Sequence, residues 1–152
     1  GLPRQTRASM AQTIAHVLAL EPDRVACFGY AHVPWFKTHQ KLIDAADLPG
    51  AAERLVDMGC RNAITTLGEL GGVVWGEYRE RYPAFAVRAV DTTAAGDAFC
   101  GALAVALHER RPLPDAVRFA SAAAALAVTK AGAQSSLPTR AACLELAQLS
   151  EA

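Results

Sequence analysis

The sequence of 152 residues has no excess charge of either sign, because 15 basic residues balance 15 acidic ones. The basic residues are interspersed along the chain, so nothing indicates a nucleic acid or an anionic membrane as partner. No apolar run approaches the length of a membrane span, and no signal-peptide pattern opens the sequence. The four cysteines are dispersed, which suits a reducing compartment. These absences predict a cytoplasmic protein.

The sequence also lacks the ligand spacing of a metal centre. Its four histidines follow no metal-ligand pattern. The cysteines are too far apart for the usual local ligands of an iron–sulfur cluster, since they stand at Cys27, Cys60, Cys100 and Cys143. With 52% hydrophobic and 20% charged residues, we expect one globular domain over residues 1–152 that needs no cofactor to fold.

Apolar periodicity and turn residues predict an α/β fold. Ser9 and Gln12 indicate a capping box for the first helix, and Gly59 indicates the end of the second. The predicted strands are 25–30, 62–67, 73–75 and 81–90, and the predicted helices after the first are 50–58, 96–110, 114–129 and 139–149. Because strands and helices alternate, a right-handed crossover should set strands 25–30 and 62–67 parallel and adjacent, in a three-layer α/β/α sandwich.

The segment DTTAAGD, residues 91–97, precedes a helical apolar pattern and carries the small residues of a helix N-terminus. The backbone N–H groups of Ala94–Gly96 would then be free and unobstructed, so this helix end favours an anion. Asp97 lies one step inside the helix, where it could take a proton from a hydroxyl while the N–H groups stabilise developing phosphate charge. Taken alone, the segment is equally typical of a capped helix whose acidic first turn complements the dipole.

Two further segments accompany this one. Residues 64–71 (ITTLGELG) indicate a strand that ends in a glycine-rich turn, and residues 127–136 (AVTKAGAQSS) close an alanine-rich helix with a glycine and a polar loop. Alone, Gly132 and Ser136 indicate a helix C-cap and a turn. In this order and spacing the three segments resemble the C-terminal half of the ribokinase family of carbohydrate kinases, from about Ala51 to the C-terminus. The resemblance implies a ribokinase-like (Rossmann-like) fold.

The resemblance also implies a role for each segment. Asp97 would be the general base that deprotonates the sugar hydroxyl. The anion hole would be the backbone of Ala94, Ala95 and Gly96, with alanine where many relatives carry glycine at the first of these positions. The ATP site would be lined by Thr66, Gly68, Gly71 and Ser121. A monovalent cation, usually potassium, would be held by Asp91, Ser136 and the main-chain carbonyls of Thr93, Ala127, Lys130 and Gly132.

Residues 1 to about 50 resemble a different family. The phrases GLPRQT (1–6) and FGYAHVPW (28–35) are similar to an internal stretch of oxygen-independent coproporphyrinogen III oxidase, a radical S-adenosylmethionine enzyme. In that family the alanine that corresponds to Ala31 contacts S-adenosylmethionine, but the CxxxCxxC cluster motif is absent here. The sequence therefore resembles a chimera of two fragments, 1–50 and 51–152, joined between Leu48 and Gly59.

The kinase-like fragment lacks the sugar-binding residues, the lid strands and the asparagine/glutamate motif that the N-terminal part of its family carries. We therefore expect a constructed or recombined scaffold rather than a working enzyme. It would keep at most a vestigial site for ATP, phosphate or sulfate and for potassium. The alternative is an active ATP-dependent carbohydrate kinase that phosphorylates a sugar hydroxyl. The strand edges and apolar patches left by the missing part predict a homodimer.

Overall fold

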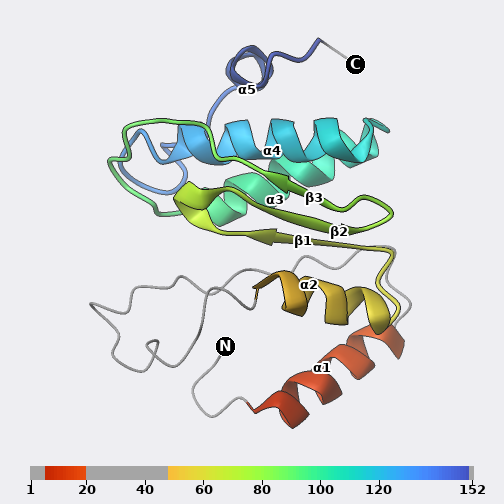
Figure 1. The fold of residues 1–152 in the computed structure, drawn as a ribbon. Coiled ribbons are helices and arrows are strands. Elements are labelled where there is room, and N and C mark those ends of the chain that lie inside the picture. Colours follow the sequence, from red (N-terminus) through yellow and green to blue (C-terminus); the bar gives the residue numbers. More distant parts are fainter. Residues whose placement is uncertain (1–5, 20–47, 151–152) are drawn as a thin grey trace. The chain divides into compact units, whose positions relative to one another are not determined.

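The computed structural model describes residues 6–19 and 48–150 (Figure 1). They form two compact units, which are described separately. The first holds the described residues up to Thr65 together with Val73–Glu80, and the second holds Thr66–Gly72 and the described residues from Arg81 onward. In chain order the elements are α1 (Arg7–Ala19), α2 (Leu48–Asp57), β1 (Asn62–Thr66), the 3₁₀ turn η3 (Gly68–Leu70), β2 (Gly72–Gly76), β3 (Glu80–Tyr82), α3 (Ala95–His108), α4 (Leu113–Ala127) and α5 (Arg140–Ala147).

The first helix begins earlier than the sequence predicted. Thr6 Oγ1 accepts the N–H of Ser9 at 3.1 Å, and Ser9 Oγ accepts the N–H of Thr6 at 2.8 Å. This reciprocal pair is a capping box in which serine takes the place usually held by glutamate or glutamine. The prediction of a box between Ser9 and Gln12 was therefore wrong, because Thr6 lies the right three residues ahead of a side chain that can return the hydrogen bond.

Three strands form one sheet in the order β1-β2-β3 (Figure 1). The start of β1 lies beside the end of β2, because Asn62 Oδ1 accepts the N–H of Glu77 at 3.0 Å. A methyl group on Gly71 would overlap the carbonyl oxygen of Tyr82, which places the start of β2 beside the end of β3. The strands therefore form two consecutive antiparallel hairpins.

The predicted strand over residues 81–90 is wrong beyond Tyr82. Pro83 follows directly, and proline has no N–H with which to extend a ladder of hydrogen bonds. The antiparallel pairing predicted for this region is confirmed by the hairpin of β2 and β3. The predicted strand 25–30, and with it the parallel pairing to residues 62–67, lies outside the described residues.

In the first unit, α2 packs on the β1–β2 hairpin. Ala52 of α2, Ala63 of β1 and Val73 of β2 form a buried cluster. Leu55, Val56 and Trp75 pack against it. Burying such apolar surface is the main favourable contribution to folding, at about 25 cal/mol per Å².

In the second unit, α4 packs between α3 and α5 (Figure 1). The core of these helices contains Phe119 and Leu144 surrounded by small side chains, namely Ala106, Ala116, Ala123 and Cys143. Alanine has no side-chain bulk, so α4 can approach its neighbours closely, as the sequence predicted. The helices and the sheet make this an α/β protein. None of the described helices is long and apolar enough to span a membrane.

Candidate functional site

The start of α3 is built on a turn that ends with a left-handed residue. The N–H of Ala95 points to the carbonyl of Thr92 at 3.4 Å, and Ala94 has φ 60° and ψ 9°. These are close to the values at the third position of a type II turn, which usually holds glycine. The carbonyl of Ala94 then accepts the N–H of Ala98 at 2.8 Å and begins the helix.

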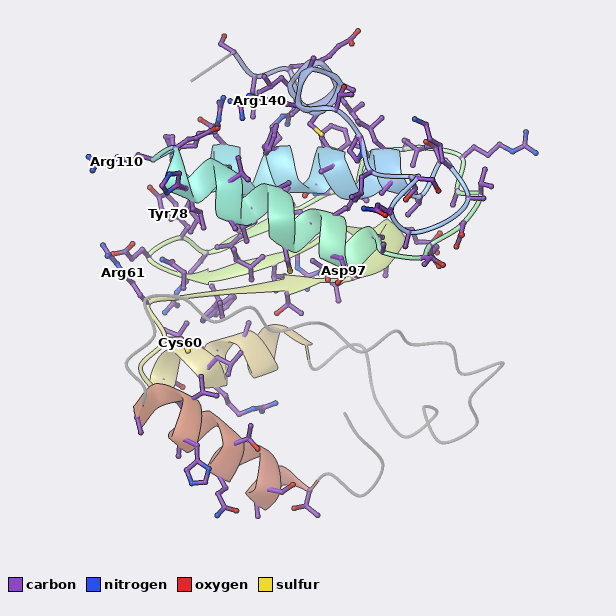
Figure 2. The ribbon with its side chains drawn as sticks, turned by 180° about the vertical axis from the view of Figure 1, so that it is seen from behind. Cys60, Arg61, Tyr78, Asp97, Arg110 and Arg140 are labelled. Atoms are coloured by element: carbon purple, nitrogen blue, oxygen red, sulfur yellow. The ribbon has the colours of Figure 1, made fainter. Side chains whose placement is uncertain are left out.

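This turn leaves backbone donors available at the helix start. Within the described residues, the N–H groups of Gly96 and Asp97 donate no hydrogen bond, as expected in the first turn of a helix. Asp97 is exposed. Figure 2 shows it at one end of α3, with Arg110 just beyond the other end. Of the N–H groups predicted for the anion hole, that of Gly96 is thus available, whereas that of Ala95 points to the carbonyl of Thr92. The N–H of Asp97 is a further donor that the sequence did not predict.

Cys100 lies one helical turn after Asp97. Burial, and secondly the negative charge of Asp97, raise the pKa of the Cys100 thiol above its usual value. An ordinary cysteine thiol is already largely protonated at neutral pH. The raised pKa therefore keeps the Cys100 thiol in the protonated form. Cys60, Cys100 and Cys143 are free cysteines.

The glycine-rich turn after β1 closes through three main-chain hydrogen bonds, one of which runs from the N–H of Leu70 to the carbonyl of Leu67 at 3.2 Å. The N–H of Leu67 donates to Gly71 at 2.6 Å, and the N–H of Gly71 donates to Gly68 at 3.1 Å. Gly68 has φ 58° with open space around it, whereas Gly71 has φ 83° and is pressed against the backbone of residues 82–84. Of these two glycines, only Gly71 needs both the positive φ and the absence of a side chain. Thr66, at the end of β1, is half-buried.

The Asp91 carboxylate joins two loops of the predicted cation site. One oxygen accepts the N–H of Thr93 at 2.9 Å, and the other accepts the N–H of Gly132, 41 residues away, at 2.9 Å. The Thr93 side chain, then the N–H groups of Gly132 and Thr93, lower the pKa of Asp91 to about 2. The group is therefore a fixed negative charge at neutral pH, and it fits a monovalent cation in that respect.

The other predicted cation ligands lie at the end of α4 and on the loop after it. The Ser136 side chain is fully buried, and its Oγ donates to the carbonyl of Ala133 at 2.9 Å. The N–H of Lys130 points to the carbonyl of Ala127 at 3.4 Å. Asp91, Thr93 and Gly132 are thus brought together directly, while Ala127 ends α4 and Lys130 and Ser136 lie on the loop that carries Gly132. No group of three or more His, Cys, Asp or Glu side chains within the described ranges could hold a metal ion.

Ser121 lies inside α4 rather than at its surface. Its hydroxyl is buried and donates to the carbonyl of Val117, one turn earlier, at 2.8 Å. This hydrogen bond satisfies the hydroxyl within the helix. The contact between Ser121 and an adenine ring therefore stays a prediction.

No sequence pattern pointed to two residues of the site, Val128 and Tyr82. The carbonyl of Val128 accepts the N–H groups of both Val90 and Asp91, at 2.7 and 3.1 Å, and so fixes the loop before the anion hole. Tyr82, at the end of β3, stacks on Phe99 of α3 with ring centroids 6.4 Å apart. A main-chain acceptor has no residue preference, and the Tyr82 contact depends on a hairpin whose register the sequence did not define.

Comparisons with known proteins find two kinds of relative. Residues 35–140 match a family model described as pfkB family carbohydrate kinase. A ribokinase of Haemophilus influenzae is 43% identical over 109 residues, which cover 71% of this chain and 36% of the relative. An anaerobic coproporphyrinogen III oxidase of Cereibacter sphaeroides is 63% identical over 54 residues, which cover 36% of this chain and 12% of the relative.

A solved structure gives the fold as ribokinase-like. Arabidopsis thaliana ribokinase, in a complex with ribose and ATP, superposes with a TM-score of 0.63 at 32% identity. The match covers 70% of this chain and 35% of that one. The chain therefore spans about a third of the length of the ribokinases that it matches, and a separate segment of it is similar to coproporphyrinogen III oxidase. The two sequence matches together exceed the length of the chain, so they overlap near the join.

Proposed function

Because this chain belongs to the pfkB family of carbohydrate kinases, we propose that it retains the anion, nucleotide and monovalent-cation site of that family without completing sugar phosphorylation. The ligands would be ATP, phosphate or sulfate, together with potassium. The residues concerned are those of the α3 start, the Thr66–Gly71 turn and the two loops that Asp91 joins. The chimeric join makes a constructed or recombined scaffold the best description of the chain.

One observation carries the proposal. The turn at Ala94 presents the N–H groups of Gly96 and Asp97 without an internal partner, and α3 adds the positive end of its dipole. Such donors bind the oxygen atoms of a phosphate and require nothing outside the helix itself. The anion-binding function is therefore local, and it survives the loss of distant parts of the relatives.

The cation would act on this anion site through the loops. Asp91 supplies the negative charge, and the carbonyl groups of Thr93, Ala127, Lys130 and Gly132 with the Ser136 hydroxyl supply neutral oxygens. Oxygen ligands of this kind suit a hard monovalent ion. Because Asp91 hydrogen-bonds the loop that leads into Ala94, a bound ion would help to order the anion hole.

Catalysis needs more than this site. If a sugar hydroxyl were held near Asp97, the carboxylate would accept its proton while the N–H groups of the α3 start hold the transferred phosphoryl group. Phosphoryl transfer depends on positioning and electrostatic stabilisation, and the chain matches only about a third of its kinase relatives. We therefore expect the chain not to turn over ribose. Active ATP-dependent phosphorylation of a sugar is the second candidate, because Asp97 is present and accessible.

Calorimetry with ATP and with inorganic phosphate in potassium buffer, alongside a coupled kinase assay with ribose, tests the proposal. We expect affinities no better than high micromolar and no turnover. In Asp97→Asn, both ligands should bind as in the parent or slightly more tightly, because a negative charge beside the anion is lost. Ribose-dependent ATP turnover that Asp97→Asn abolishes would establish the second candidate instead. Absence of any anion binding would refute the retained site.

A further inference from the structure

The glycine-rich turn and the start of α3 are joined through one residue of β3. On one side, Gly71 lies so close to Tyr82 that an added methyl group would overlap the Tyr82 carbonyl oxygen and come within 2.7 Å of the Ala84 nitrogen. On the other side, the Tyr82 ring stacks on the Phe99 ring with an angle of 16° between their planes. Phe99 is buried, and it follows Asp97 by two residues in α3.

We propose that Tyr82 is a positioning residue that sets the distance between the nucleotide-lining turn and the anion-binding helix start. Its backbone fixes the turn at Gly71, and its ring fixes the first turns of α3 at Phe99. Both contacts are made within the second compact unit. A change in the size of the ring would therefore shift the helix start relative to the turn.

The surroundings of Tyr82 suit a positioning residue. Burial, and secondly the neighbouring Cys100 thiol, raise the pKa of the Tyr82 hydroxyl above its usual value. The side chain is therefore neutral over the whole working range of pH and supplies no charge to an anion. Stacked aromatic pairs of this kind contribute about 0.5–1.5 kcal/mol beyond the apolar area that they bury.

This inference rests on the proposed function, and it separates two classes of ligand. Inorganic phosphate contacts only the α3 start, so its binding does not depend on where the turn lies. ATP has to reach both the α3 start, with its phosphates, and the Thr66–Gly71 turn, with the remainder of the nucleotide. Its affinity therefore depends on the spacing that Tyr82 sets.

The experiment compares ATP and inorganic phosphate binding, by NMR titration, in the parent, Tyr82→Leu and Tyr82→Phe. In Tyr82→Leu we expect ATP to bind about tenfold more weakly, the loss that one stacked aromatic pair represents, with phosphate affinity unchanged within error. Tyr82→Phe keeps the ring and should bind both ligands as the parent does. Phe99→Leu removes the stack from the α3 side and should repeat the selective loss, which keeps the test valid should Tyr82→Leu not fold.

Several results would overturn the inference. Equal weakening of both ligands would assign Tyr82 a general role in stability, and unchanged ATP affinity in the folded leucine variants would remove its role altogether. Loss of ATP binding in Tyr82→Phe would show that the hydroxyl, not the ring, is what matters. If the parent bound neither ligand, the proposed function would fail along with the inference. Phosphate binding without ATP binding in the parent would overturn the inference and the nucleotide part of the proposed function, and it would leave the anion site.

Discussion

At the scale of single residues, Ala94 has a backbone conformation that is unusual for its side chain, as do Arg110 and Gln148 in the described part of the chain. Its φ of 60° is left-handed, a conformation that costs an L-residue about 1–2 kcal/mol. Glycine would remove that cost but would lose more chain entropy on folding. We expect Ala94→Gly to stabilise the protein by up to about 1 kcal/mol.

The matched control for this prediction is Ala95→Gly, one residue along and inside α3. Glycine in a helix is unfavourable by about 0.5–1 kcal/mol relative to alanine, so this variant should be less stable than the parent or equal to it. Urea denaturation measures both variants. A less stable Ala94→Gly protein would show that the α3 start does not have the turn described here.

The lowered pKa of Asp91 predicts that the stability of the protein depends on pH. Its hydrogen bonds to Thr93 and Gly132 lower its folded pKa from 3.8 to about 2. The ionised form is therefore favoured in the folded state, so its contribution is fully present above about pH 4 and is lost as pH falls towards 2. Asp91→Asn removes the charge while keeping the shape of the side chain.

We expect Asp91→Asn to melt at a lower temperature than the parent at pH 7, and the two melting temperatures to converge towards pH 2. Thermal unfolding followed by circular dichroism across this range makes the comparison. A difference in melting temperature that stays constant from pH 7 to pH 2 would mean that the Asp91 charge does not join the two loops.

At the scale of elements, α5 depends on a single cap. Thr139 Oγ1 accepts the N–H of Ala142 at 3.3 Å, and the helix then buries Cys143, Leu144 and Ala147. Replacing a threonine N-cap by alanine costs about 1 kcal/mol. Thr139→Ala should lower the free energy of unfolding by that amount, and Thr139→Ser should not, because serine keeps the hydroxyl. Equal stability of all three proteins in urea would count against the cap.

The helices were largely predictable from the sequence, and the sheet was less so. The starts of α4 and α5 follow from Pro114 and Thr139, because proline and threonine have defined preferences at a helix N-terminus. The end of β3 was missed although Pro83 marked it, since the mostly apolar residues 84–90 outweighed the proline. Strand pairing depends on contacts distant in sequence, and periodicity alone does not define them.

The candidate site, too, was predictable from the sequence in some parts and not in others. The α3 start was predicted because small residues and an acidic first turn are a local signal. Gly71 was assigned to the site by the family resemblance, and the structure adds that its close approach to other backbone demands glycine. The Val128 carbonyl and the Tyr82–Phe99 stack were not predicted. Both are tertiary contacts, and neither requires a residue type that a sequence pattern would single out.

At the scale of the whole molecule, the chain combines segments of two unrelated families. It spans about a third of the length of its kinase relatives. Leu70 and Val90, both in the second unit, are 74% and 63% exposed. Exposed apolar residues and strand edges favour association.

We therefore expect the chain to form a homodimer. Sedimentation velocity at rising protein concentration should show a dimer that dissociates on dilution, with Leu70→Ser and Val90→Ser shifting the equilibrium towards the monomer. Both substitutions lie at exposed positions, so they should leave the melting temperature of the monomer nearly unchanged. A clean monomer of the parent at high micromolar concentration would contradict this prediction.

The central proposal is that the start of α3 is an anion site. Titration of ¹⁵N-labelled protein with inorganic phosphate, followed through the backbone amide signals, tests it most directly. The amides of Gly96 and Asp97 should shift together and saturate with one dissociation constant, because their N–H groups are the donors without an internal partner. If these two signals stayed in place while phosphate moved others or none, the claim would be wrong.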